Sequence, residues 1–113
     1  MQWSSAPGAG FTTGEPWLPL ADDAATRNVE TMSGDPGSIL GLYRALLDLR
    51  RREPALTTGA FMPVGAEGDV LLYARSHEDR RFLIALNLRP HPATVALPVP
   101  GAYEVVLSTA MDR

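Results

Sequence analysis

The order of apolar and polar residues divides this chain into three stretches. Residues 1–37 are rich in Gly, Pro, Ser, Thr and Asp, and their apolar residues follow neither a helical nor a strand period. Residues 36–52 have the period of a helix, and from Gly59 onward short stretches suit strands. The pattern predicts a long ordered loop, one helix and an antiparallel sheet, a mainly β fold with one helix.

The helix is predicted to begin at Asp35-Pro36, where Asp35 acts as the N-cap and Pro36 as the first helical residue. Pro54 ends it because proline cannot donate the next helical hydrogen bond. Its apolar residues span an arc of about 180°, wider than the stripe of a simple surface helix. We therefore expect this helix to be covered on two sides. The arc consists of Ile39, Leu40, Leu42, Tyr43, Leu46, Leu47 and Leu49.

Five segments have the length and composition of strands, with turn residues between them. Because the connections are short and contain no helix, the strands should form an antiparallel meander or sandwich. The segments are Ala60–Val64, Val70–Arg75, Arg81–Leu88, Ala93–Leu97 and Tyr103–Leu107.

Length and charge exclude several classes of function. A chain of 113 residues is normally one domain, and a net charge of −3 gives no footprint for nucleic acid. The chain has no Cys, no run long enough to span a membrane, and no signal peptide at Met1–Ser5. We expect a cytoplasmic protein that binds neither nucleic acid nor membranes.

The sequence offers no set of catalytic or metal-binding residues. Catalysis by a pair of carboxyl groups needs two acids that meet across a cleft, but Asp22-Asp23 and Glu78-Asp79 are neighbours in predicted turns. Glu30 fits either a cleft or a structural hydrogen bond. His77 and His91 lack a second ligand at metal spacing. We therefore expect no catalytic residue, no metal and no cofactor in this chain.

Two features suit either a binding surface or packing. Trp3, Phe11 and Trp17 stand in the first stretch, where flat rings either stack on a sugar or pack the loop onto a neighbouring surface. Arg50 falls inside the apolar arc, where its side chain either extends toward water or pairs with an acid at a domain boundary.

Several motifs resemble one family of sugar-processing enzymes. Met1-Gln2-Trp3, Phe11-Thr12-Thr13-Gly14 and Pro16-Trp17-Leu18-Pro19 resemble the segment after the eighth barrel strand of oligo-1,6-glucosidases and related α-glucosidases. These enzymes belong to glycoside hydrolase family 13, the α-amylase superfamily. Asn28-Val29-Glu30 and Ser38-Ile39-Leu40 continue the resemblance. Trehalose synthases share the first motif and the helix pattern, and remain an alternative.

The resemblance implies a (β/α)8 barrel followed by an antiparallel C-terminal domain. Residues 1–37 would be the loop after the last barrel strand, 38–53 the last barrel helix, and 54–113 the C-terminal β domain. The family pattern continues into one or two more strands beyond Arg113, so an incomplete domain with an open sheet edge is expected.

The resemblance also implies an activity for the parent enzyme. Terminal α-glucosidic bonds would be cleaved with retention, by an Asp and a Glu from segments before Met1. Trp3, Phe11 and Trp17 would rim the pocket, and the partners would be the remaining barrel and a small α-glucoside. The chain by itself would be inactive, with a structural role, and its uncovered helix could drive self-association. A non-catalytic sugar-binding module is the further alternative.

One departure from the family pattern affects the loop. The family usually has Asp after Met-Gln-Trp, often followed by another acid, whereas this chain has Ser4 and Ser5. A hydrogen bond or a charge at the pocket rim is therefore expected to be lost or changed.

Overall fold

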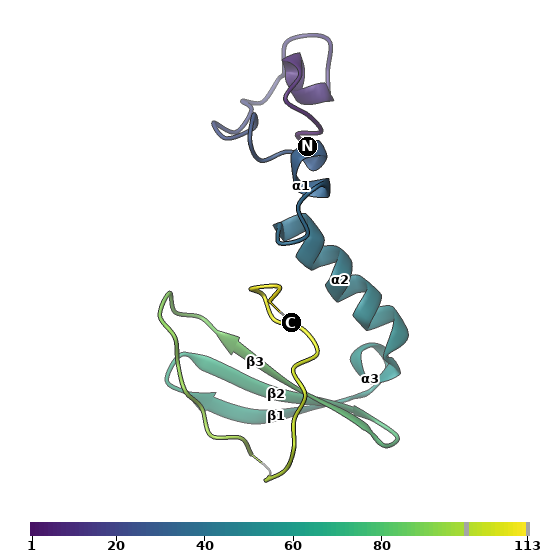
Figure 1. Cartoon of the computed structure of the whole chain (residues 1–113), viewed down its shortest axis with the longest axis vertical. Helices are drawn as coiled ribbons and strands as arrows, with labels where there is room; N and C mark the ends of the chain where they lie inside the picture. Colours follow the sequence, from purple (N-terminus) through teal and green to yellow (C-terminus); the bar gives the residue numbers. More distant parts are fainter. Residues whose placement is uncertain (99, 113) are drawn as a thin grey trace. The chain divides into compact units, whose positions relative to one another are not determined.

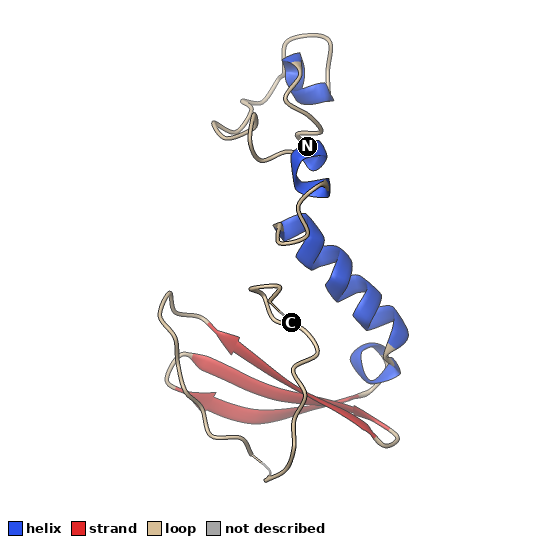
Figure 2. Cartoon of the chain, viewed as in Figure 1, coloured by secondary structure: helices blue, strands red, loops and turns tan. Residues whose placement is uncertain are grey.

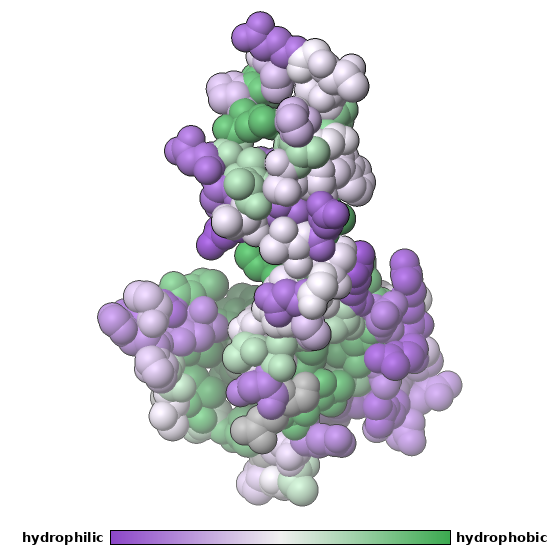
Figure 3. All heavy atoms as spheres, turned by 45° about the horizontal axis from the view of Figure 1, so that its top comes forward, coloured by the Kyte–Doolittle hydropathy of each residue, from purple (hydrophilic) through white to green (hydrophobic). Residues whose placement is uncertain are grey.

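The structure is a computed structural model that describes residues 1–98 and 100–112. These residues form two compact units, one of residues 1–47 with 105–112 and one of residues 48–98 with 100–104. The described residues contain a 14-residue helix and a three-stranded sheet, both visible in Figures 1 and 2, and Figure 3 shows apolar as well as polar residues at the surface. The predicted fold class, the last helix of a barrel followed by an antiparallel sheet, is confirmed. The structure also contains shorter helical segments.

The first unit begins with a folded loop that contains two short helices. A 3-10 helix, η1, spans Pro7–Gly10, and α1 spans Val29–Ser33. Sequence periodicity missed both elements because a helix of four or five residues is too short to repeat an apolar position. The predicted loop therefore contains two helical segments that the sequence pattern did not indicate.

Helix α2, Ile39–Arg52, begins three residues later than predicted. Its N-cap is Ser38 rather than Asp35: the Ser38 hydroxyl accepts the Gly41 N–H at 3.1 Å, and the Ser38 carbonyl accepts the first helical bond, from Leu42 N–H, at 2.9 Å. Asp35 instead accepts the Gly37 N–H at 2.9 Å, a local turn that competes with the helix. The predicted end before Pro54 is confirmed.

No residue of α2 is buried. Four large apolar residues of the predicted arc remain exposed: Ile39 at 63%, Tyr43 at 61%, Leu46 at 43% and Leu47 at 50%. The predicted cover on two sides is absent from the described residues of this chain. An apolar helical face of this kind needs a partner surface to become stable.

The second unit is built on a meander of three antiparallel strands in the order β1-β2-β3. After α3 (Pro54–Thr57) come β1 (Ala60–Glu67), β2 (Val70–His77) and β3 (Arg80–Asn87), each within three residues of its predicted bounds. Buried side chains alternate along β2, where Val70, Leu72 and Ala74 are at most 5% exposed. A register shift at Pro63/Gly65 interrupts β1.

The two remaining strand predictions are wrong. Residues 93–97 and 103–107 are described and have no strand conformation. Pro90, Pro92, Pro98 and Pro100 flank or precede these segments and cannot donate to a ladder. Alternating apolar residues give a segment β-propensity, but that propensity alone does not impose strand conformation.

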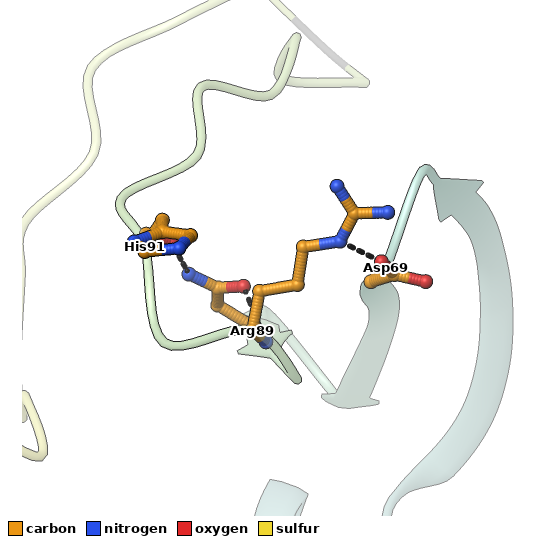
Figure 4. A network of polar contacts seen from close by, with 4 residues as sticks. Asp69, Arg89 and His91 are labelled. Carbon is orange, nitrogen blue, oxygen red and sulfur yellow. Dashed lines mark hydrogen bonds and ion pairs between the residues drawn. The ribbon is translucent and has the colours of Figure 1, made fainter.

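Polar contacts close the open end of the sheet (Figure 4). The Asn87 amide donates to the His91 carbonyl at 2.7 Å and accepts the Arg89 N–H at 3.0 Å, while the Arg89 guanidinium pairs with Asp69. These contacts tie the turn between β1 and β2 to the chain that leaves β3.

Candidate functional site

Two of the three predicted aromatic residues line the same hollow. An open hollow of about 380 Å³ lies in the first unit, between residues 1–2, 11–12 and 15–20. Phe11 and Trp17 are among its lining residues, and Trp3 is not. We call it the aromatic hollow. Phe11 also borders a second hollow of about 430 Å³, lined by Pro7, Gly10, Thr12 and Thr13.

The rings of this region are exposed to different degrees. Trp17 is 88% exposed, Phe11 62% and Trp3 48%. Exposed rings of this kind present a flat apolar face to a ligand or to a partner surface. The structure thus brings Phe11 and Trp17 together on a shared surface and leaves Trp3 beside it, within the backbone network that holds the loop.

A left-handed turn sets the position of Phe11. Gly8, Ala9 and Gly10 have φ values of 67°, 55° and 64°, and Ala9 is buried. The Phe11 N–H donates to the Gly8 carbonyl at 3.0 Å. Two of these three residues are glycine because a side chain is strained in this backbone region.

Replacing Gly10 by alanine is expected to disorder this turn. A Cβ at Gly10 would lie 2.7 Å from the Ser4 hydroxyl, on a backbone with φ of 64°. We expect the local free energy of unfolding to fall by about 1–2 kcal/mol, measured as faster amide exchange around Phe11. Gly14→Ala is the control, because its φ is not left-handed and the nearest atom to its Cβ is 3.9 Å away. Equal effects of the two changes would contradict the prediction.

The Ser4 hydroxyl accepts the Ala6 N–H at 3.3 Å, a bond that an aspartate at this position can also make. Ser4 and Ser5 are uncharged, so these two positions give the loop no negative charge.

The carboxylates do not form a catalytic pair. Asp23 is bound at 3.4 Å to Arg27, four residues further along the loop, and Glu78-Asp79 forms the turn between β2 and β3. Glu30 is exposed in the first turn of α1, and its side chain makes no hydrogen bond within the described residues. Glu15, which sequence reasoning missed, lines the aromatic hollow. One carboxylate there can bind sugar hydroxyls but cannot supply both groups that retention needs.

No three His, Asp or Glu side chains in residues 1–98 and 100–112 gather as ligands for a metal ion. Within the same residues, no helix has the length and apolar content needed to cross a bilayer.

Arg50 lies in the last turn of α2 with an exposed side chain, and it forms no ion pair within the described residues. Other arginines make the contacts of this region. Arg75 donates to the carbonyls of Ala55 and Thr57, both at 3.2 Å, and Arg80 binds Glu53 with two hydrogen bonds, at 2.8 and 3.3 Å. The Glu53 carboxylate raises the pKa of Arg80 above its usual value.

Two buried polar residues, Asn28 and Ser38, were also not identified as site candidates from the sequence. Asn28 is 0% exposed and Ser38 is 9% exposed. Each precedes a helix, and its side-chain oxygen accepts an N–H from that helix's first turn. The signal that could have found them is a capping residue directly before an apolar run.

Comparison with known proteins assigns the family. Residues 1–59 match the alpha-amylase family, described as the alpha amylase catalytic domain. The chain belongs to the α-amylase family. The match includes both hollows, α1, α2 and α3, and it ends directly before β1.

Two of the relatives are named as glucosidases. A probable alpha-glucosidase of Rhizobium meliloti (strain 1021) is 36% identical over 88% of this chain and 18% of its own length. Probable oligo-1,6-glucosidase 2 of Bacillus subtilis (strain 168) is 33% identical over 87% of this chain and 18% of its own length. The predicted resemblance to these glucosidases is confirmed.

The fold is shared with a solved α-amylase family structure. The trehalulose synthase of Pseudomonas mesoacidophila MX-45 is 36% identical, covers 78% of this chain with a TM-score of 0.73, and is matched over 16% of its own length. The chain thus spans less than a fifth of the length of each of these three proteins.

Proposed function

We propose that this chain serves as the C-terminal part of a retaining α-glucosidase that acts on small α-glucosides. Residues 1–37 would be the loop after the last barrel strand, 38–53 the last barrel helix, and 54–113 the C-terminal β domain. The match of residues 1–59 to the α-amylase catalytic domain supports this division. The observation that carries the proposal is the exposed apolar face of α2, which the remaining barrel would cover.

In such an enzyme, α2 would have a structural role and the aromatic hollow would contact the substrate. Phe11 and Trp17 would stack on the sugar at the pocket rim, and Glu15 would bind a hydroxyl. Trp3 would support the rim, and Arg50 would pair with an acid of the barrel. The catalytic Asp and Glu would come from the barrel, so the isolated chain would not hydrolyse isomaltose.

A chimeric enzyme tests this proposal. The segment of the Rhizobium meliloti relative that aligns with this chain is replaced by the chain itself. We expect the chimera to release glucose from isomaltose, and Phe11→Ala to raise its KM about threefold or more, because ring contact with substrate is lost. Phe61→Ala is the matched control, since Phe61 is 58% exposed in the other unit. A folded chimera without activity would refute the proposal.

Two alternatives have specific support. The likeness to a trehalulose synthase favours a glucosyl isomerase, which would convert sucrose to an isomeric disaccharide rather than to free glucose and fructose. The exposed aromatic hollow favours a sugar-binding module. In that case, isomaltose would shift the amide signals around Phe11 and Trp17 saturably in the isolated chain.

A further inference from the structure

The backbone of residues 2–4 is held from two directions. On one side, the N–H groups of Val29 and Glu30 donate to the carbonyls of Gln2 and Trp3, at 3.1 and 2.9 Å. On the other side, the N–H groups of Trp3 and Ser4 both donate to the Ala9 carbonyl, at 2.8 and 3.2 Å. Residues 2–4 therefore connect α1 directly to the left-handed turn that precedes Phe11.

Asn28 completes the start of α1. Its side-chain oxygen accepts the Thr31 N–H at 2.9 Å, so the first three N–H groups of α1 are bound by Gln2, Trp3 and Asn28 in turn. Its amide nitrogen donates to the carbonyls of Ala24 and Ala25, at 3.1 and 3.2 Å. Because Asn28 is 0% exposed, losing these bonds would leave polar groups without solvent to replace them.

Ser38 joins the other end of α1 to α2. Its hydroxyl donates to the Met32 carbonyl at 2.7 Å and accepts the Gly41 N–H at 3.1 Å. One side chain thus binds the last turn of α1 and the first turn of α2.

We propose that Asn28 and Ser38 are positioning residues that fix the aromatic hollow to α2. The path runs from α2 through Ser38 to α1, and from α1 through residues 2–4 to the turn before Phe11. The purpose of this path rests on the proposed function: when α2 docks on a barrel, the same path would also position Phe11 and Trp17 at the rim of the pocket. Neither residue lines the aromatic hollow, so each would act through the backbone that it holds.

The test uses NMR of the full 113-residue chain, without sugar or barrel. In the native chain, residual dipolar couplings of residues 2–4, 29–33 and 39–47 should fit one alignment tensor. In Ser38→Ala, the couplings of residues 39–47 should no longer fit the alignment tensor of residues 2–4 and 29–33. Asn28→Leu should speed exchange of the Val29, Glu30 and Thr31 amides about tenfold and shift the Trp3 indole signal.

A conservative variant separates positioning from general stability. Asn28→Asp keeps the acceptor for Thr31 and loses both amide donors, so Thr31 should stay protected while the couplings of residues 2–4 change. Asn87→Leu is the control: the Asn87 side chain also both donates and accepts hydrogen bonds, but in the other unit, and its loss should leave Trp3 unchanged. A single tensor that persists in Ser38→Ala and Asn28→Asp overturns the proposal.

Activity gives an independent readout. In a chimera that is active with the native chain, Ser38→Ala should raise KM about threefold with little change in kcat. An inactive native chimera would count against the glucosidase role and leave the NMR result standing. An active chimera with an unchanged KM would count against the positioning role alone.

Discussion

Replacing Gly59 by alanine is expected to unfold the sheet unit. An alanine Cβ at this position would lie 2.4 Å from the Ala55 carbonyl oxygen, 2.6 Å from the Ser76 carbonyl oxygen and 2.7 Å from the Ala55 Cα. All three are backbone atoms, so no side chain can rotate away to make room. Helix α3 and strand β2 would have to separate, and with them the buried Ala55 and the contacts of Arg75.

The expected loss is about 3 kcal/mol or more in the free energy of unfolding. Unfolding in urea, followed by the amide signals of residues 70–77, measures it. Gly101→Ala is the matched control in the same unit, because its Cβ would meet no atom within 4 Å and its φ is not left-handed. A Gly59→Ala chain as stable as the Gly101→Ala chain would show that α3 does not pack against β2 this closely.

The second large effect is expected at the exposed face of α2. The isolated chain should self-associate through this face, because Leu46 and Leu47 are about half exposed and burying the rest of each is worth roughly 0.7–1.5 kcal/mol. Leu46→Glu with Leu47→Glu should return the chain to the mass of a monomer, with its helix retained, since Glu favours helices. Light scattering over a concentration series measures the mass.

The same double change should inactivate the chimera, because two carboxylates would be forced against the barrel. Arg44→Glu is the control: Arg44 is exposed on the polar side of α2, where the one hydrogen bond of its side chain among the described residues is a 3.4 Å bond to Ser33. A native chain that remains a monomer at all concentrations would contradict self-association. A fully active double variant would show that this face is not the barrel contact.

The sequence could predict elements whose signal is local and repeated. Helix α2 and strands β1 to β3 were found because apolar residues recur along 8 to 14 residues. Strand predictions at 93–97 and 103–107 failed because alternation gives only a propensity, and the prolines around these segments cannot donate to a ladder. The helix start was misplaced because Asp35 and Ser38 are both good caps, and only the fold assigned Ser38 to Met32 and Gly41.

The sequence likewise predicted only part of the candidate site. Motifs of the loop and the helix were enough to indicate the α-amylase family, which the match over residues 1–59 confirmed. Only the tertiary structure placed Phe11 and Trp17 on one hollow, added Glu15 to it and left Trp3 in the backbone network. The physical reason is that the order of residues fixes local conformation and chemistry, whereas convergence of side chains depends on long-range bonds such as those from Val29 and Glu30 to residues 2 and 3.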